Sequence, residues 1–205
     1  MSGADPEVSV VIVNWNTRQR LLACLHSLAD ERSRLDLEVL VVDNASGDDS
    51  AGSAASAHPW IRMIRNNRNR GFAAAANQGL AQARGRVWVL LNPDTEVRPG
   101  ALGVMADYLH ASDHVWAAGP RLVHPDGTLQ PSGRRFPTLG GFLLEGVLPS
   151  SWRRTRWWRR RRFGREDFRV RARVDEVSGA CLAARREAYA RVGALDERFF
   201  LYYEE

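Results

Sequence analysis

The first half of the chain alternates apolar runs with segments of helical pattern. The runs lie at residues 8–13, 39–42 and 87–91, with a shorter fourth candidate at residues 61–64. Runs with so few polar positions are typical of strands that are buried on both faces. Leucines at helical spacing follow the first run, and an alanine-rich stretch precedes the last. Strands that alternate with helices predict an α/β fold with a mostly parallel sheet flanked by helices.

The regular alternation ends near residue 120. Residues 124–127, His-Pro-Asp-Gly, predict a tight turn, and residues 131–138 are rich in Pro, Gly and Arg. A short helix is expected over residues 140–148, and residues 174–184 predict a strand that enters a helix at residues 185–192. We therefore expect one domain made of a regular part, residues 1–120, and a smaller irregular part, residues 121–205.

Polar residues follow each predicted strand. In open parallel sheets, ligands bind where the carboxyl ends of the strands emerge, so these positions are the first candidates for a site. Four strand ends are expected to converge on one crevice. The residues concerned are Asn14, Trp15, Asn16, Asp43, Asn44, Asn66, Asn69, Asn92, Pro93 and Asp94.

Trp15 and Asp43 have the chemistry to recognise a nucleobase. An indole can stack on the base, and a carboxylate can accept the N3 hydrogen of uracil or thymine. The alternative is that Trp15 belongs to the core and that Asp43 only caps the next helix. The two residues by themselves do not decide between these interpretations.

Asp94 is a candidate metal ligand. It follows a strongly apolar strand, where a carboxylate is costly without a partner. Mg²⁺ takes one or two carboxylates and completes its shell with phosphate oxygens and water, and Asn92 offers a neutral ligand beside it. The alternative is that Asp94 begins a turn before Pro99.

A helix start that suits an anion is expected at Asn69, Arg70 and Gly71. Backbone N–H groups at a helix start favour negative charge, and Arg70 adds positive charge. Asn77 lies within the same helix, and an ordinary helix start is the alternative. No glycine-rich dinucleotide fingerprint or P-loop occurs in the sequence, which argues against an oxidoreductase or a P-loop nucleotidase.

Residues 152–173 interleave arginines with tryptophans, and all 29 basic residues of the chain are Arg. Arg pairs with phosphate and Trp prefers the headgroup level of membranes, so a peripheral contact with an anionic membrane is one interpretation. A solvated loop and single-stranded nucleic-acid binding are the alternatives. The polar amino terminus, the lack of an apolar run of roughly 20 residues and the two separated cysteines favour a cytoplasmic protein.

Five segments of the chain, taken together and in order, closely resemble the family 2 glycosyltransferases, particularly their rhamnosyltransferase-like branch. The segments are VSVVIVNWN, VVDNASGDDS, NRNRGFAAAANQG, LLNPDTEV and VSGACLAARREAYARVGALDERFFLYYEE. The resemblance implies the GT-A fold, with a nucleotide-sugar-binding half at residues 1–120 and an acceptor half at residues 121–205. It implies transfer with inversion from dTDP-L-rhamnose or a UDP-sugar to a glycan or lipid-linked acceptor, in cell-wall or polysaccharide biosynthesis. Peripheral attachment at the inner face of the cell membrane follows from such an acceptor, and no nucleic-acid partner is expected.

The resemblance also assigns roles to residues. Trp15 lies against the nucleobase, Asp43 accepts from its N3–H, and Asp94 binds Mg²⁺ or Mn²⁺. Asn92 departs from the Asp-x-Asp pattern that is commonest in the family. The expected nucleotide-sugar contacts are Asn14, Trp15, Asn16, Asp43, Asn69, Gly71, Asn77 and Asn92, and the expected acceptor-side residues are Ser178, Gly179 and Ala180.

Two carboxylates at the end of the chain, Glu204 and Glu205, follow an aromatic run. Apolar surroundings raise the pKa of a carboxyl group toward the range of a general base, and chance placement is the alternative. By resemblance Glu205, where the family carries Asp, is the base, with Glu204 as the other candidate. Family members continue beyond this point, so a shortened chain is expected. Its alternative function is that of a truncated, inactive protein that only binds the donor.

Overall fold

The computed structural model describes residues 5–136, 138 and 170–200. Two compact units are present, one made of residues 1–118 and 179–205 and the other of residues 119–178. The last part of the chain therefore groups with the first 118 residues, whereas the sequence suggests a single boundary near residue 120. The helix expected over residues 140–148 lies outside the described residues.

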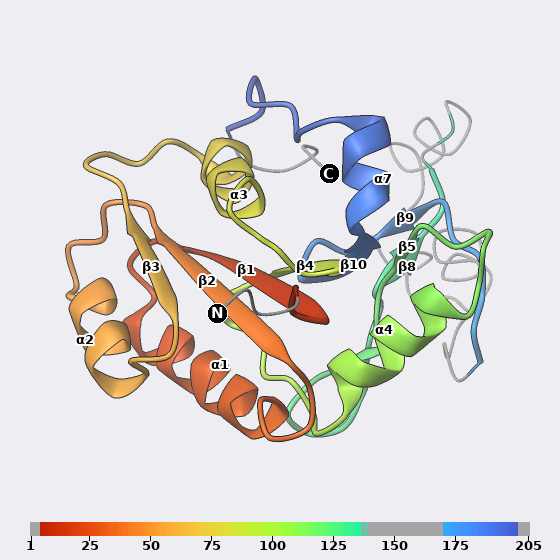
Figure 1. Cartoon of the computed structure of the whole chain (residues 1–205), viewed down its shortest axis with the longest axis horizontal. Coiled ribbons are helices and arrows are strands. Elements are labelled where there is room, and N and C mark those ends of the chain that lie inside the picture. Colours follow the sequence, from red (N-terminus) through yellow and green to blue (C-terminus); the bar gives the residue numbers. More distant parts are fainter. Residues whose placement is uncertain (1–4, 137, 139–169, 201–205) are drawn as a thin grey trace, which may run out of the picture. The chain divides into compact units, whose positions relative to one another are not determined.

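A six-stranded sheet in the order β3-β2-β1-β4-β10-β5 forms the centre of the first unit (Figure 1). β1 pairs in parallel with β2 and β4, and β2 pairs in parallel with β3. β10 runs antiparallel to both β4 and β5. The mostly parallel sheet predicted from the apolar runs is confirmed. Its strands are β1 (Val8–Asn14), β2 (Leu37–Asp43), β3 (Arg62–Arg65), β4 (Val87–Leu91), β10 (Cys181–Arg185) and β5 (Ala117–Ala118).

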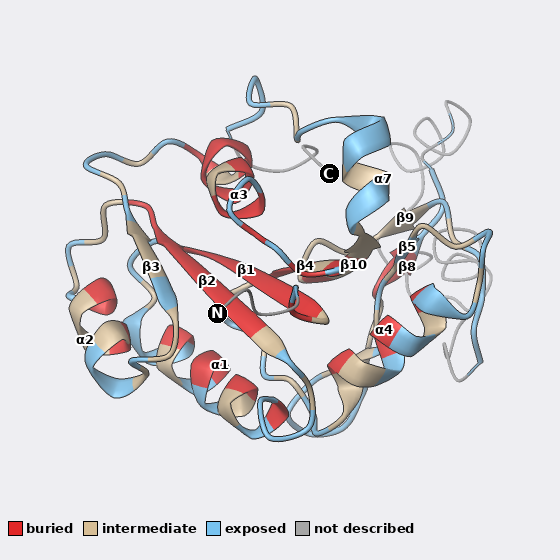
Figure 2. Cartoon of the chain, in the orientation of Figure 1, coloured by how far each residue is buried: buried red, intermediate tan, exposed pale blue. Residues whose placement is uncertain are grey.

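Helices cover both faces of this sheet (Figure 1). Helices α1 (Arg18–Glu31), α2 (Ser50–Ala57) and α4 (Ala101–His110) lie on one side. Helices α3 (Phe72–Leu80) and α7 (Arg186–Val192) lie on the other. Figure 2 shows that the buried residues concentrate in β1, β2, β4 and the sheet-facing side of α3.

The alanine-rich composition of α3 lets this helix lie close to the sheet. Ala75 and Ala76 are fully buried against Val11 and Leu40. A Cβ atom at Gly79 would lie 2.4 Å from the Cγ1 atom of Val11. Because real Cβ atoms do not approach so closely, a larger residue there would push α3 away from the strands.

Two acidic side chains accept hydrogen bonds from backbone N–H groups at the starts of helices. The Asp48 carboxylate accepts hydrogen bonds from the backbone N–H of Arg18 at 2.9 Å and of Ser50 at 3.1 Å, so it serves α1 and α2 together. The Ser50 hydroxyl also donates to it and is the main cause that lowers the pKa of Asp48. Glu31, only 1% exposed, accepts from the N–H of Gly100 and of Leu102 at the start of α4.

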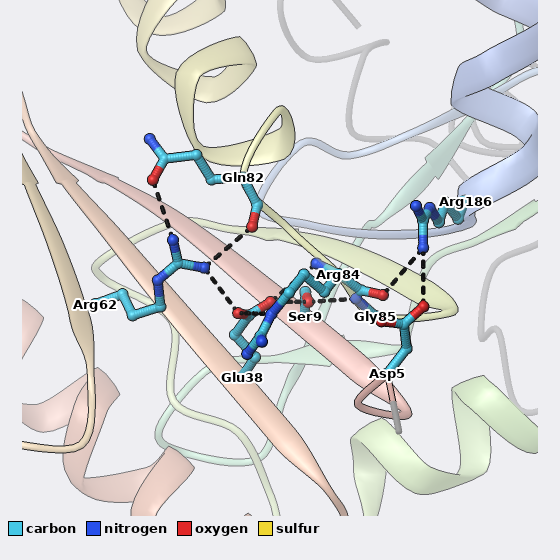
Figure 3. A network of polar contacts seen from close by, with 8 residues as sticks. All are labelled: Asp5, Ser9, Glu38, Arg62, Gln82, Arg84, Gly85 and Arg186. Carbon is cyan, nitrogen blue, oxygen red and sulfur yellow. Dashed lines mark hydrogen bonds and ion pairs between the residues drawn. The ribbon is translucent and has the colours of Figure 1, made fainter. Parts of the chain in front are cut away.

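A buried carboxylate joins the amino ends of the strands (Figure 3). Glu38 is 7% exposed and accepts from the Ser9 hydroxyl at 2.6 Å, the Arg62 guanidinium at 2.9 Å and Arg84 Nε at 3.0 Å. Ser9 in turn accepts from the N–H of Gly85 at 2.8 Å. Burial by itself raises the pKa of Glu38, but the hydrogen bonds from Ser9, Arg84 and Arg62 outweigh it and lower the pKa. The network joins β1, β2, β3 and the start of β4 at the amino ends of the parallel strands.

The described residues of the second unit form two short antiparallel strand pairs. β6 (Leu122–Val123) pairs with β7 (Leu129–Gln130) across residues 124–127, where the N–H of His124 donates to the Thr128 carbonyl. The predicted tight turn is therefore confirmed, and Gly127 has φ +82°. β8 (Gly133–Arg134) pairs with β9 (Glu176–Val177). Residues 174–184 thus hold two strands instead of the single one expected, because β9 pairs within this unit and β10 pairs with β4.

Candidate functional site

Asp43 stands at the centre of the β1 and β2 ends. Its Oδ1 accepts from Asn14 Nδ2 at 2.9 Å, and its Oδ2 accepts from the backbone N–H of Ser46 at 3.1 Å. Asn14 is fully buried and Asp43 is 4% exposed. Each carboxylate oxygen has two acceptor sites, so the fixed Asp43 can still accept a hydrogen from a ligand. Asp43 does not cap α2, because Asp48 takes the N–H of Ser50.

Trp15 is exposed. It follows directly after β1 and 55% of its surface is accessible, so it does not belong to the core. The next residue, Asn16, has φ +53°, donates its N–H to Ser46 Oγ and accepts from the N–H of Gly47. These bonds hold the β1–α1 loop against the β2–α2 loop, and the indole is left with a face that a planar ligand can cover.

Backbone strain accompanies these loops. Asn16, Ala45 and Asp49 are non-glycine residues with φ of +53°, +65° and +59°. Such conformations cost roughly 1–3 kcal/mol each and persist where the surrounding structure enforces them. Ala45 lies between Asp43 and Ser46, so the strain falls on the turn that delivers the Ser46 N–H to the carboxylate.

Asn44 organises the loop that leads into α3, a role that the strand-end pattern alone did not reveal. It is 2% exposed, and its Nδ2 donates to Asn69 Oδ1 at 2.8 Å and to the Gly71 carbonyl at 3.1 Å. Its Oδ1 accepts from the backbone N–H of Arg70 at 3.0 Å and from Asn66 Nδ2 at 3.1 Å. Asn69 and Gly71 are therefore held beside the end of β2.

Glycine is the only residue type that fits at position 71, before α3. The φ of Gly71 is +83°, and a Cβ atom there would lie 2.8 Å from the Phe200 carbonyl oxygen. The N–H of Phe72 donates to that same carbonyl at 2.8 Å. The first N–H of α3 is thus occupied by the chain itself.

Asn77 also makes its contacts within the chain. Its Nδ2 donates to the Leu195 carbonyl and to Glu197 Oε1, both at 3.0 Å. Its Oδ1 accepts from the Tyr189 hydroxyl at 3.1 Å and from the N–H of Leu195 at 3.0 Å. The structure places Asn77 at the side of α3 that faces the segment after α7.

Two exposed carboxylates, Asp94 and Glu96, follow β4, and Asp94 is the one nearer to the end of the strand. The Asp94 side chain is half exposed, and its Oδ2 lies 3.7 Å from Arg20 NH1. Asn92 donates its backbone N–H to the Ala180 carbonyl at 3.0 Å. Among the described residues, no group of three or more His, Cys, Asp and Glu side chains is arranged to hold a metal ion. A single carboxylate with a neighbouring amide fits Mg²⁺ or Mn²⁺ that shares its shell with a diphosphate, as Mg²⁺ commonly does.

The two cysteines lie under this corner as buried thiols. Burial, with smaller contributions from Cys181, Asp94 and Glu96, raises the pKa of Cys24 to about 12. Burial likewise raises the pKa of Cys181 to about 12. Both thiols stay protonated at neutral pH, so neither is available as a nucleophilic thiolate.

The expected acceptor-side residues divide between the two units. Ala180 accepts from the Asn92 N–H and from Thr95 Oγ1 at 3.3 Å, which brings it beside the end of β4. Ser178 donates its N–H to the Ser132 carbonyl within the second unit. Glu204, Glu205 and residues 152–169 lie outside the described residues. Across the part of the chain that is described, no helix has the length and apolar character to span a membrane.

Comparison with known proteins gives consistent results. The sequence model of the family "Glycosyl transferase family 2" matches residues 9–193. N-acetylglucosaminyl-diphospho-decaprenol L-rhamnosyltransferase of Mycobacterium tuberculosis is 33% identical over 216 residues, covering 100% of this chain and 69% of the relative.

Solved structures share the fold at low identity. A mannosyltransferase of Pyrobaculum calidifontis, in complex with GDP-Man and Mn²⁺, superposes with a TM-score of 0.62 at 20% identity over 95% of this chain. S. aureus TarS 1–349 in complex with UDP gives a TM-score of 0.62 at 16% identity over 97% of this chain. The chain spans about half of each of these solved chains, 48% and 52% respectively.

Proposed function

The chain belongs to glycosyl transferase family 2, and on this basis we propose that it transfers a sugar from a nucleotide diphosphate donor to a hydroxyl of a glycan or lipid-linked acceptor. The observation that carries the proposal is the fixed Asp43 carboxylate beside the exposed Trp15 at the strand ends. In this arrangement Trp15 stacks on the base and Asp43 accepts its N3–H.

The same contacts restrict the donor. Uracil and thymine both carry an N3–H, so Asp43 favours a UDP-sugar or dTDP-L-rhamnose. The L-rhamnosyl transfer named for the M. tuberculosis relative supports rhamnose as the sugar, and its decaprenol-linked substrate supports a lipid-linked acceptor in cell-wall glycan synthesis. Asn14, Asn16, Asn69 and Gly71 shape this donor site, and Asn92 and Asp94 border its diphosphate end.

Asp94 is the proposed ligand of a divalent metal, with Asn92 as a neutral second group. The Mn²⁺ in the complex of the Pyrobaculum mannosyltransferase supports this assignment. When bound, such a metal neutralises the charge that develops on the leaving diphosphate. Arg20, 3.7 Å from Asp94, contributes further positive charge at the same corner.

Transfer requires a base for the acceptor hydroxyl, and Glu205 or Glu204 is proposed for this role. The carboxylate removes the proton while the oxygen attacks the anomeric carbon opposite the diphosphate, which inverts the configuration. General base help of this kind is worth roughly 10² to 10⁴ in rate. Ser178, Gly179 and Ala180 are proposed to border the acceptor, and residues 152–173 to contact the anionic membrane surface that presents it.

Nucleotide binding tests the proposal directly. UDP, dTDP, GDP and ADP are titrated by calorimetry with Mg²⁺ or Mn²⁺ against the wild type, Trp15→Ala and Trp60→Ala. We expect UDP or dTDP to bind, and Trp15→Ala to weaken binding about tenfold to hundredfold, because base stacking on an aromatic ring is worth about 1–3 kcal/mol.

Trp60→Ala is the matched control, since Trp60 packs on Arg32 and His58 instead of at the strand ends. It should bind like the wild type. Failure of every nucleotide to bind, or equal losses in both Trp variants, would show that the donor site is wrong.

A further inference from the structure

The hydrogen-bonding capacity of the Asn77 side chain is fully used within the chain. An asparagine amide has two N–H donors and a carbonyl oxygen with two acceptor sites. In Asn77 the donors go to Leu195 O and Glu197 Oε1, and the acceptor sites take Tyr189 Oη–H and Leu195 N–H. Asn77 is also 9% exposed. It has no group left for a donor sugar, so a different role is required.

The segment that Asn77 holds has little other support. Helix α7 has no buried residue, and Val192 at its end is 88% exposed. Within residues 196–200, apart from the bond between Glu197 and Asn77, the side-chain hydrogen bonds among the described residues are local, between Arg198 and Asp196. Long-range support comes from Leu195, which packs against the core beneath α3, and from Tyr189, whose ring lies 5.0 Å from that of Trp88. Asn77 bonds to both of these residues.

A second attachment lies farther along α3. Phe200 accepts from the N–H of Phe72 and lies against Gly71, six residues before Asn77 and therefore about 9 Å away along the helix axis. The segment thus runs along α3 toward its amino end, as its course after α7 in Figure 1 illustrates. That end is joined through the Gly71 carbonyl to Asn44, the residue after Asp43.

We infer that Asn77 is a positioning residue: it fastens Leu195 and Glu197 to α3 and so holds the segment that ends at Phe200, beside Gly71 of the proposed donor site. The inference rests on the proposed function for the role of Glu204 and Glu205. Asn77 acts on the rate of transfer and leaves donor binding unchanged, because Asp43 is held by Asn14 and Ser46, neither of which bonds to Asn77.

The test compares Asn77→Ala with Tyr189→Phe and Ser9→Ala in the full chain. Asn77→Ala removes all four hydrogen bonds, and Tyr189→Phe removes one. Ser9→Ala is the matched control. It also removes buried hydrogen bonds, to Glu38 and Gly85, but it does so at the amino ends of the strands. Hydrogen exchange of residues 193–200, the Kd for UDP or dTDP, and kcat are measured for each variant.

In Asn77→Ala we expect faster exchange in residues 193–200, a Kd within about twofold of the wild type and a kcat lowered tenfold to a hundredfold. Misplacement of a reacting group by about 1 Å costs roughly a hundredfold in rate. Tyr189→Phe should lie between Asn77→Ala and the wild type, and Ser9→Ala should change neither the exchange of this segment nor kcat.

Two results would overturn the inference. A Kd that weakens as much as kcat falls would make Asn77 a donor contact, and unchanged exchange in residues 193–200 would show that it does not fasten the segment. A wild type that binds no nucleotide contradicts the proposed function instead, and the exchange result then still decides whether Asn77 holds the segment.

Discussion

Asp94 and Arg20 form an ion pair after β4, where the diphosphate of the donor is proposed to bind. Both side chains are at least half exposed and lie 3.7 Å apart. An exposed pair of this kind is worth about 0–1 kcal/mol, so a divalent metal that arrives with a diphosphate can displace Arg20 at little cost. Because Asn92 is neutral, Asp94 is the one charged ligand proposed for the metal, and we expect the affinity for the metal to depend on bound nucleotide.

Asp94→Asn tests this expectation, with Asp107→Asn on the exposed face of α4 as the control for charge. We expect Asp94→Asn to abolish the increase in nucleotide affinity that Mg²⁺ or Mn²⁺ produces, and to lower turnover at least tenfold. Asp107→Asn should behave as the wild type in the same metal titrations. A metal response retained in Asp94→Asn would remove this residue from the site.

At the scale of elements, the amino ends and the carboxyl ends of the parallel strands differ in structure. The carboxyl ends of β1 and β2 carry strained loops and an exposed indole. The amino ends carry Glu38, whose hydrogen bonds from Ser9 and Arg62 join three neighbouring strands (Figure 3). Stability at the amino ends of the strands can offset backbone strain at the carboxyl ends, where the donor is proposed to bind.

Glu38→Gln should therefore destabilise the fold in a pH-dependent manner. Hydrogen bonds to a charged group are worth about 1.5–3 kcal/mol, and we expect a loss of this size at pH 7. Because the pKa of Glu38 is lowered below its usual 4.5 in the folded state, its stabilising effect is complete above that value and is lost as pH falls through the folded pKa.

Urea unfolding of the wild type and Glu38→Gln between pH 7 and pH 3 measures this effect. The difference in unfolding free energy should be constant near neutral pH and shrink below about pH 4.5. A difference that stays the same to pH 3 would mean that the ionised carboxylate is not what stabilises the network.

At the scale of the whole molecule, the formal net charge is +5 and residues 152–173 carry a dense share of the arginines. These arginines and the tryptophans beside them predict binding to anionic vesicles that weakens with salt, because exposed charges are screened over about 10 Å at 0.1 M. We expect the wild type to float with vesicles that contain anionic lipid and not with neutral ones.

Replacing Arg159, Arg160, Arg161 and Arg162 with Ala should lower recovery in the flotation assay several-fold at low salt. The exposed residues Arg18, Arg32, Arg34 and Arg98 provide a matched quadruple alanine control. Equal flotation of both variants would assign membrane binding, if present, to another part of the chain.

The sequence determined the fold and most of the strand-end residues. Apolar runs fix which segments are strands, and the rule that ligands bind at the carboxyl ends of strands makes Asn14, Trp15, Asp43 and Asp94 candidate site residues. The exposure of Trp15 and the capping of α2 by Asp48 then removed the alternative interpretations of Trp15 and Asp43.

Only the tertiary structure decided what the asparagines do. Asn44 and Asn77 are similar polar residues in the sequence, yet one joins the end of β2 to Gly71 and the other holds Leu195, 118 positions away. Glu38 likewise gains its partners from β1, β3 and the start of β4. Apolar periodicity is a local property that the sequence carries directly, whereas a hydrogen-bond partner is set by which elements the packed sheet brings together.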